Sequence, residues 1–339
     1  MQALFSRATG LIFSLTFIAA INSSAAHAQY KVTNLVSSQK GKAAHQDSAL
    51  INAWGITNDP GGAFWISDAG SGETTLYNAS GVSQGNPISI PSASGSAVGS
   101  PTGVVYNRSS GFVIDDWTSE FIYATLDGTI SGWSQFVPNT AIIGLDNSHS
   151  GASYTGLAIS AANDTLYAAD TANNEIDMIN SSFQVVKTFT DSTIPAGFVV
   201  SGIQDINGKL YVAYVASSGG AGGYIDIFSE AGTFQKRFAH GAPLNQPWGF
   251  ALAPKNFGAL SSALLIANNT NSGTIVAYNV KTGKYIGTLK SNGKAVKINQ
   301  LWGIRFGDGH ASTGAKNALF FTAGPNNNLA GLFGVITAE

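Results

Sequence analysis

The sequence predicts an all-β, six-bladed β-propeller of four-stranded blades, and three observations lead to that prediction. A glycine followed by an apolar residue recurs six times, at intervals of 46 to 54 residues. Two further strand-like runs follow each of these glycines, separated by turns rich in Gly, Asn and Ser. No segment shows a convincing helical period. Repeats of about 50 residues, each long enough for four short strands, are typical of propeller blades.

The recurring glycine, called the anchor glycine below, opens the first strand of each unit. The six anchors are Gly55, Gly103, Gly156, Gly202, Gly249 and Gly303. We expect the anchor strand to line the central channel, where backbones crowd together and a residue without Cβ is favoured. The residue before the anchor is Trp in units one, five and six and Thr or Ser in units two, three and four.

A second strand in each unit ends in a small or polar residue, and a third strand follows after a turn. The second strands end at Asp68, Thr125, Asp170, Tyr214, Asn268 and Ala323. The runs are rich in aromatic and β-branched residues, which favour strands. Because neighbouring strands are antiparallel, the ends of the second strands should share one face of the disc with the residues before the anchors.

The two ends of the domain are expected to meet in one blade. The last unit has three strand-like runs before Glu339, and an unassigned strand-like segment, YKVTNLVS, covers residues 30–37. We predict that this segment supplies the outermost strand of the last blade, which would protect edges that are otherwise exposed.

The first 28 residues have the layout of a secretory signal peptide. Arg7 precedes an apolar run over residues 11–21, and Ala26 and Ala28 fit a cleavage site before Gln29. The run is too short to span a membrane. The sequence therefore predicts an exported protein, periplasmic or extracellular, with no membrane span.

Composition excludes several classes of function for the predicted mature domain, residues 29–339. Charged residues make up 11% of the chain, against about 25% in an average protein, and the formal net charge is −2. Neither nucleic acid nor an anionic membrane is indicated as a partner. The chain has no cysteine, which excludes disulfides, thiol catalysis and cysteine-ligated metals. No motif of a serine hydrolase, zinc protease or phosphate-binding loop is present.

The candidate binding site is the channel mouth on the face that carries the tryptophans. Units five, six and one are neighbours in the ring, so one half of this mouth should be aromatic and the other hydroxylated. The residues of the candidate site are Trp54, Trp248, Trp302, Asp68, Asp170, Thr102, Thr155 and Ser201. Two interpretations remain open: the tryptophans bind a sugar ring or another flat ligand, or they pack between blades.

A metal site is a further hypothesis, although the sequence requires no cofactor. His45, His149 and His240 lie in the connections that lead into units one, three and five. Three imidazoles directed at the axis could hold Zn²⁺ with an open position for water, whereas the alternative is three solvated loop histidines. Carboxylates such as Asp68 and Asp170 could hold Ca²⁺, or serve glycoside or lactone chemistry.

Several long motifs carry a resemblance to a known family. NAWGI, FWISDAGSGETTLYN, PAGFVVSGIQDINGKLYVAY and LWGIRFG resemble an uncharacterised family of exported bacterial proteins, some of which end in a PEP-CTERM sorting tail. LYAADTANNEI looks like an NHL-type repeat. The resemblance implies an exported six-bladed propeller of unknown activity. Two features depart from the family pattern: Leu126 replaces an acidic residue, and the chain has no sorting tail, which favours a periplasmic or released protein.

The leading functional hypothesis is a ligand-binding or protein-interaction propeller without intrinsic catalysis, with carbohydrate or another exported protein as partner. The alternative is an NHL-like propeller enzyme, a lyase or a lactone or glycoside hydrolase, that uses a metal or carboxylates at the channel mouth. A deep channel with convergent charged groups would favour the enzyme. A shallow or plugged channel would favour the binding protein.

Overall fold

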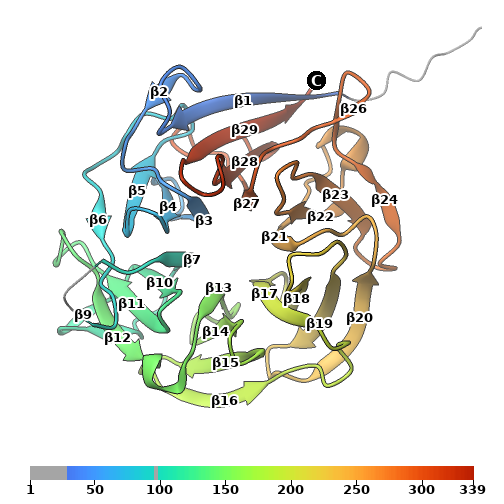
Figure 1. Cartoon of the computed structure of the whole chain (residues 1–339). Helices are drawn as coiled ribbons and strands as arrows, with labels where there is room; N and C mark the ends of the chain where they lie inside the picture. The colour runs from blue at the N-terminus through green and yellow to red at the C-terminus, as the bar shows by residue number, and fades with distance from the viewer. Residues whose placement is uncertain (1–28, 95–97) are drawn as a thin grey trace, which may run out of the picture.

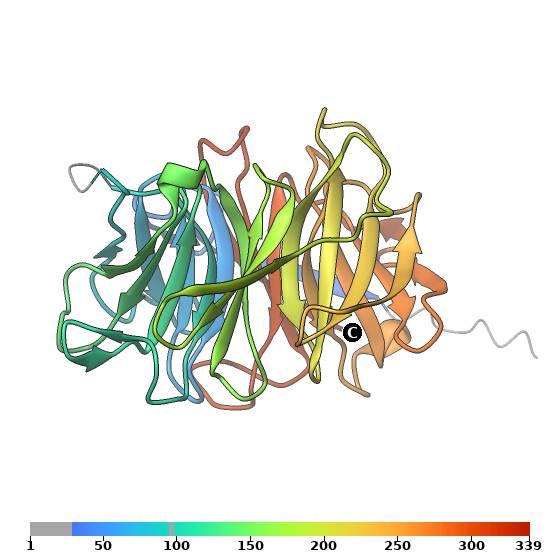
Figure 2. The same cartoon turned by 90° about the horizontal axis from the view of Figure 1, so that it is seen from below.

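Six antiparallel sheets stand as blades around a central channel in the computed structural model, as the anchor spacing predicts (Figure 1). The structure describes residues 29–94 and 98–339, so the predicted signal peptide, residues 1–28, lies outside the described residues. Seen from the side, the blades form a thick disc (Figure 2). Within the described ranges the helical segments are two short 3₁₀ turns, Ser148–Ser150 and Gly258–Leu260.

The strands of each blade follow one another outward from the channel. Blade one holds β3 (Ala53–Asn58), β4 (Phe64–Asp68), β5 (Glu73–Tyr77) and β6 (Ile88–Ser89). Blade two holds β7 (Pro101–Tyr106), β10 (Phe121–Thr125), β11 (Thr129–Trp133) and β12 (Ile142–Asp146). Blade three holds β13 (Tyr154–Ile159), β14 (Thr165–Asp170), β15 (Glu175–Asn180) and β16 (Val185–Phe189).

The other three blades repeat this order. Blade four holds β17 (Phe198–Asp205), β18 (Lys209–Ala216), β19 (Tyr224–Ser229) and β20 (Phe234–His240). Blade five holds β21 (Pro247–Leu252), β22 (Ala263–Asn268), β23 (Ile275–Asn279) and β24 (Tyr285–Thr288). Blade six holds β27 (Leu301–Phe306), β28 (Ala318–Ala323), β29 (Leu332–Ala338), β1 (Tyr30–Ser37) and a short fifth strand, β2 (His45–Gln46).

Two small hairpins lie outside the blades. One is formed by β8 (Val113–Ile114) and β9 (Trp117–Thr118), between the first two strands of blade two. The other is formed by β25 (Lys290–Ser291) and β26 (Lys294–Ala295), between blades five and six.

The predicted closure of the ring by the N-terminal strand is confirmed. β1 pairs with β29 along its length and lies beside it at the rim (Figure 1). The buried Tyr30 at its start reaches into blade five, where its hydroxyl donates to the carbonyl of Phe257 (2.8 Å) and accepts from the amide of Leu260 (2.9 Å). The strand is therefore fixed to two blades.

The anchor glycines sit at the closest approach between neighbouring blades, which confirms the reason given for their recurrence. A Cβ on Gly202 would lie 2.2 Å from the carbonyl oxygen of Trp248 in the next blade. A Cβ on Gly249 would lie 2.4 Å from the carbonyl oxygen of Trp302. Real Cβ contacts with backbone atoms are essentially never this short. At Gly202 and Gly249 a side chain is therefore excluded by backbone crowding around the channel.

The hydroxyl of Thr322 links blade six to blade one. Thr322 is fully buried in β28 and donates to the carbonyl of Trp54. It also accepts a hydrogen bond from the amide of Gly303 (2.9 Å). One side chain thus satisfies two buried backbone groups on neighbouring inner strands.

Candidate functional site

The ends of the second strands lie beside the starts of the inner strands, as the sequence predicts. Ala53 pairs with Asp68, Tyr154 with Asp170, and Pro247 with Asn268. The tryptophans and these strand ends consequently share one face of the disc. We call the channel opening on this face the tryptophan mouth.

The three tryptophans meet over the channel rather than form a crescent around an open mouth. Trp54 stacks on Trp302 with ring centroids 3.7 Å apart, and Trp248 meets both edge-on at 6.2 and 5.8 Å. Trp248 reaches across the ring and donates from Nε1 to the carbonyl of Thr155 in blade three (2.8 Å). Large aromatic rings gain more from burial against one another than from standing apart in water. The two interpretations of the tryptophans, packing between blades and ligand binding, therefore apply to the same cluster of three rings.

A small hollow of about 130 Å³ adjoins this cluster, and we call it the tryptophan hollow. Its lining is Trp54, Trp248, Trp302, Thr155, Thr171, Ser201, Val215, Gln246, Pro247 and Asn269. Five of the eight predicted site residues therefore line one space. Thr102, Asp68 and Asp170 do not line it.

The predicted hydroxyls hold neighbouring blades together. Thr102 donates to the carbonyl of Tyr154 (2.8 Å), Thr155 to that of Ser201 (2.7 Å), and Ser201 to that of Pro247 (3.0 Å). Each bond joins an inner strand to the inner strand of the next blade. Because these hydroxyls already donate their protons to backbone carbonyls, Thr155 and Ser201 can act only as hydrogen-bond acceptors for a ligand in the tryptophan hollow.

The two predicted aspartates are fully buried and serve the blades in which they lie. Asp170 accepts hydrogen bonds from the backbone amides of Ser153 (3.0 Å) and Asn173 (3.2 Å). Asp68 accepts from the hydroxyl of Thr75 (2.8 Å), and burial raises its pKa well above the ordinary range. Neither carboxyl lines the tryptophan hollow. Their position follows from the strand register, which turns them into the sheet.

The three histidines are not brought together. His45 lies in β2 at the rim, His149 in a 3₁₀ turn, and His240 at the end of β20, where its ring stacks on Tyr224 with centroids 6.0 Å apart. All three are exposed. Over the described residues no group of three or more His, Asp or Glu side chains is placed to hold a metal ion.

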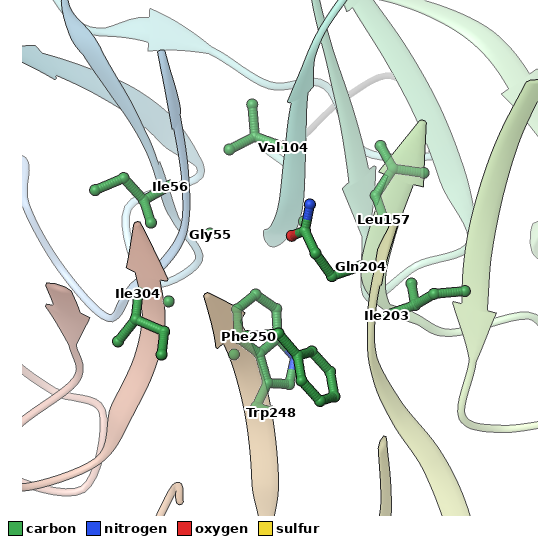
Figure 3. Close-up of a pocket in the computed structure, with 12 residues that line it drawn as sticks. Gly55, Ile56, Val104, Leu157, Ile203, Gln204, Trp248, Phe250 and Ile304 are labelled. Atoms are coloured by element: carbon green, nitrogen blue, oxygen red, sulfur yellow. The ribbon is translucent and has the colours of Figure 1, made fainter. Parts of the chain in front are cut away.

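The channel itself is plugged. The residue after each anchor is bulky and apolar, and these six side chains come from all six blades: Ile56, Val104, Leu157, Ile203, Phe250 and Ile304 (Figure 3). The free space among them is about 30 Å³, the order of a single water molecule. Gln204 points toward the same space (Figure 3). No substrate-sized group fits in the channel at the level of these six side chains.

A second and larger hollow, of about 490 Å³, opens where the inner strands end, away from the tryptophans. We call it the arginine hollow. Its polar and charged lining is Thr57, Asn58, Tyr106, Arg108, Ser160, Asn163, Gln204, Asp205, Arg305, Asp308 and His310. Sequence reasoning missed this site. A signal was present, because the second residue after each anchor is uncharged in five units and is Arg305 in the sixth.

Arg305 is held in place by an amide relay from blade one. Its Nε donates to Oδ1 of the buried Asn58. The Nδ2 of Asn58 in turn donates to Oδ2 of Asp308 (3.1 Å) and to the carbonyl of Asp59 (2.9 Å). Two acceptors around Nδ2 fix the orientation of the amide. The guanidinium is thereby oriented without a direct ion pair.

A carboxyl with a raised pKa, that of Asp205, also lines the arginine hollow. Asp205 accepts a hydrogen bond at Oδ1 from the amide of Gly208 (3.1 Å), while its buried Oδ2 has no partner among the described residues. Burial raises the pKa of Asp205 to about 6, and the neighbouring Glu230 raises it further. The carboxyl can therefore donate or accept a proton near neutral pH.

The fold and its two hollows define the protein as a six-bladed β-propeller with a plugged channel. No protein family model matches the chain. An uncharacterized protein of Acanthamoeba polyphaga mimivirus is 30% identical over 331 residues, covering 91% of this chain and 80% of that protein. Another from the same virus is 30% identical over 303 residues, covering 82% and 79%. The chain belongs to the same family as these viral proteins, whereas the sequence resemblance pointed to exported bacterial proteins.

Solved structures agree with the fold at low sequence identity. A protein of unknown function from Bacteroides thetaiotaomicron aligns with a TM-score of 0.59 and 12% identity, covering 92% of this chain and 76% of that one. Virginiamycin B lyase from Staphylococcus aureus aligns with a TM-score of 0.55 and 14% identity, covering 91% and 99%. These likenesses concern the fold alone. Over the described residues, no helix has the length and apolar character needed to cross a membrane.

Proposed function

We propose that this protein is an exported carbohydrate-binding propeller whose tryptophan hollow takes one sugar ring. The observation that carries the proposal is the convergence of Trp54, Trp248 and Trp302 on one small hollow beside polar side chains. Trp248 and Trp302 are partly exposed, whereas Trp54 is 7% exposed and lies deeper. Aromatic rings offer flat apolar surface to the C–H face of a pyranose, and polar neighbours can bind its hydroxyls.

The size of the hollow suits a single ring. An apolar cavity of about 150 Å³ holds benzene, and the tryptophan hollow measures about 130 Å³ and is open to solvent. The Nε1 of Trp54 is buried and has no acceptor among the described residues. A ligand hydroxyl would supply that acceptor, while Gln246 and Asn269 lie on the same lining for further hydrogen bonds.

The plugged channel supports binding over catalysis. The enzyme alternative placed a metal or carboxylates at the channel mouth, but Asp68 and Asp170 are buried inside their blades. A scaffold that presents a shallow site needs no group to move a proton. Export of the chain, with residues 1–28 as its signal peptide, belongs to this proposal.

A glycan array followed by isothermal titration calorimetry tests the proposal. We expect Trp302→Ala to weaken the best glycan at least tenfold. Trp117→Ala is the matched control, because Trp117 is 42% exposed on the β8–β9 hairpin and stacks on Phe136 rather than on the cluster. No glycan bound, or the same affinity in both variants, would refute the proposal. So would a double variant, Trp54→Phe with Trp248→Phe, that leaves stability and every affinity unchanged.

A further inference from the structure

The arginine hollow contains a partly buried cation, Arg305, that forms no ion pair within the described residues. The described residues form three ion pairs, Arg237 with Asp191 and Asp226, and His310 with Asp308, and Arg305 is in none of them. Among the described residues its guanidinium makes one hydrogen bond, through Nε, and the two terminal nitrogens have no partner. Burial lowers the pKa of Arg305 to about 10, so the guanidinium is still charged at neutral pH.

Arg237 provides a comparison, because its guanidinium is paired with acidic side chains of the fold. Its Nε donates to Oδ1 of Asp226 (2.9 Å), its Nη2 contacts Asp191, and its guanidinium lies over the ring of Tyr224, 4.8 Å from the centroid. Nε, Nη2 and one face of that guanidinium therefore have protein partners. Arg305 lines an open hollow and has no such partners, so the contrast between the two arginines points to an anion at Arg305.

Asp308 does not act as the direct counter-ion of Arg305. Asp308 raises the pKa of Arg305 through space, but the carboxylate is occupied by other donors. Its Oδ2 accepts from Asn58 (3.1 Å) and from the amide of Gly61 (3.0 Å). Its Oδ1 accepts from the hydroxyl of Thr313 and the backbone amide of His310 (3.1 Å), and it lies 3.0 Å from the ring Nδ1 of His310. Asp308 therefore positions Asn58, which orients the guanidinium toward the hollow.

A second cation faces the same space. Arg108 is exposed on the loop after β7 and lines the hollow, and its charge lowers the pKa of Arg305. Its backbone amide donates to Oδ1 of Asn163 in blade three (3.1 Å), which holds the loop against the neighbouring blade. Two guanidinium groups that repel each other are stabilised when an oxyanion lies between them.

We infer that the arginine hollow binds a small organic oxyanion, a carboxylate or a phosphate monoester, with its charged group on Arg305 and Arg108 and a hydroxyl or ammonium group toward Asp205. The volume of about 490 Å³ suits a ligand of one or two rings. Asp205 also lines the hollow and can offer its carboxyl to that hydroxyl or ammonium group. This site does not depend on the tryptophan hollow.

Thermal melting of the full-length protein at constant ionic strength tests the inference with three probes: inorganic phosphate, D-glucose 6-phosphate and D-glucuronate. At 20 mM, at least one should raise the melting temperature by 2 °C or more relative to chloride, while D-glucose should not. A larger shift with the phosphates assigns the site to a phosphate monoester, and a larger shift with D-glucuronate assigns it to a carboxylate. No shift with any probe overturns the inference.

Two substitutions separate a binding role from a structural one. Arg305→Met should abolish the anion-dependent shift and leave the melting temperature without anion unchanged or higher, because no ion pair within the described residues is lost. Lys284→Gln removes one positive charge from an exposed turn in blade five and should keep the full shift. An Arg305→Met protein that still responds, or that melts lower without anion while Arg305→Lys restores stability but no response, would assign Arg305 to the fold instead.

Discussion

A methyl group on Gly202 should destabilise the fold strongly, whereas the same methyl group on Gly156 should cost almost nothing. Both residues are anchors at the same position of their blades. A Cβ on Gly202 would lie 2.2 Å from the carbonyl oxygen of Trp248, and the two next nearest atoms are also Trp248 backbone, at 2.9 and 3.1 Å. A Cβ on Gly156 would lie 3.1 Å from the carbonyl oxygen of Ser201. The first overlap can be relieved only by moving a strand of the next blade.

The magnitudes follow from these distances. Forcing an added methyl group into a packed site costs about 1–3 kcal/mol or more, and Gly202→Ala belongs at the upper end. Alanine also restricts the unfolded chain, which returns about 0.4–1 kcal/mol in both variants. The expected net losses are about 2 kcal/mol for Gly202→Ala and about zero for Gly156→Ala. With an unfolding entropy of roughly 2.1 cal/mol/K per residue, 2 kcal/mol lowers the melting temperature by about 3 °C.

Urea unfolding and thermal melting of the two variants beside the parent protein would measure the difference. Equal destabilisation would show that the cost comes from the glycine backbone rather than from contact with the next blade. An unchanged Gly202→Ala protein would show that the inner strands lie further apart than in this structure, and the explanation of the anchors would then be wrong.

Three further changes have defined outcomes. Thr322→Val should cost about 1–3 kcal/mol, because it leaves the carbonyl of Trp54 and a buried amide unpaired; an unchanged urea midpoint would contradict this. Tyr30→Phe should cost a similar amount by releasing two backbone groups in residues 257–260, and protection of the N-terminal strand from hydrogen exchange should fall. Burial raises the pKa of Asp205 from 3.8 to about 6, so its contribution to stability is complete below pH 4 and is lost as the pH rises through 6. Asp205→Asn should therefore flatten the fall in urea midpoint between pH 4.5 and 7, and an unchanged slope would assign that fall to other groups.

The fold was predictable because its signals are local. Each anchor glycine and the strand end 12 to 22 residues later recur within one unit, so the period of about 50 residues identifies the blades. The closing strand was predictable from residues 30–37, which have a strand pattern and no unit of their own. The tryptophan face was predictable from strand register alone.

The sites were only partly predictable because they join distant residues across the ring. Whether Trp54 and Trp248 stand apart or touch depends on the width of the channel, which no sequence pattern gives. The Nε of Arg305 and the Oδ1 of Asn58 meet across 247 positions of the chain, so no local motif marks the arginine hollow. The sequence could not show whether His45, His149 and His240 meet, because they lie in different parts of the ring, in β2, a 3₁₀ turn and β20.

The plug in the channel decides how the two hollows relate. A six-residue inner strand spans about 17 Å, and β27 carries Trp302 near one end and Arg305 toward the other. Between the two mouths the bulky side chains after the anchors leave about 30 Å³, so a ligand cannot pass from one face to the other. Substitutions at one mouth therefore leave the lining of the other in place. A glycan-binding defect in Trp302→Ala and an anion-binding defect in Arg305→Met report on two separate sites, and either proposal can fail while the other holds.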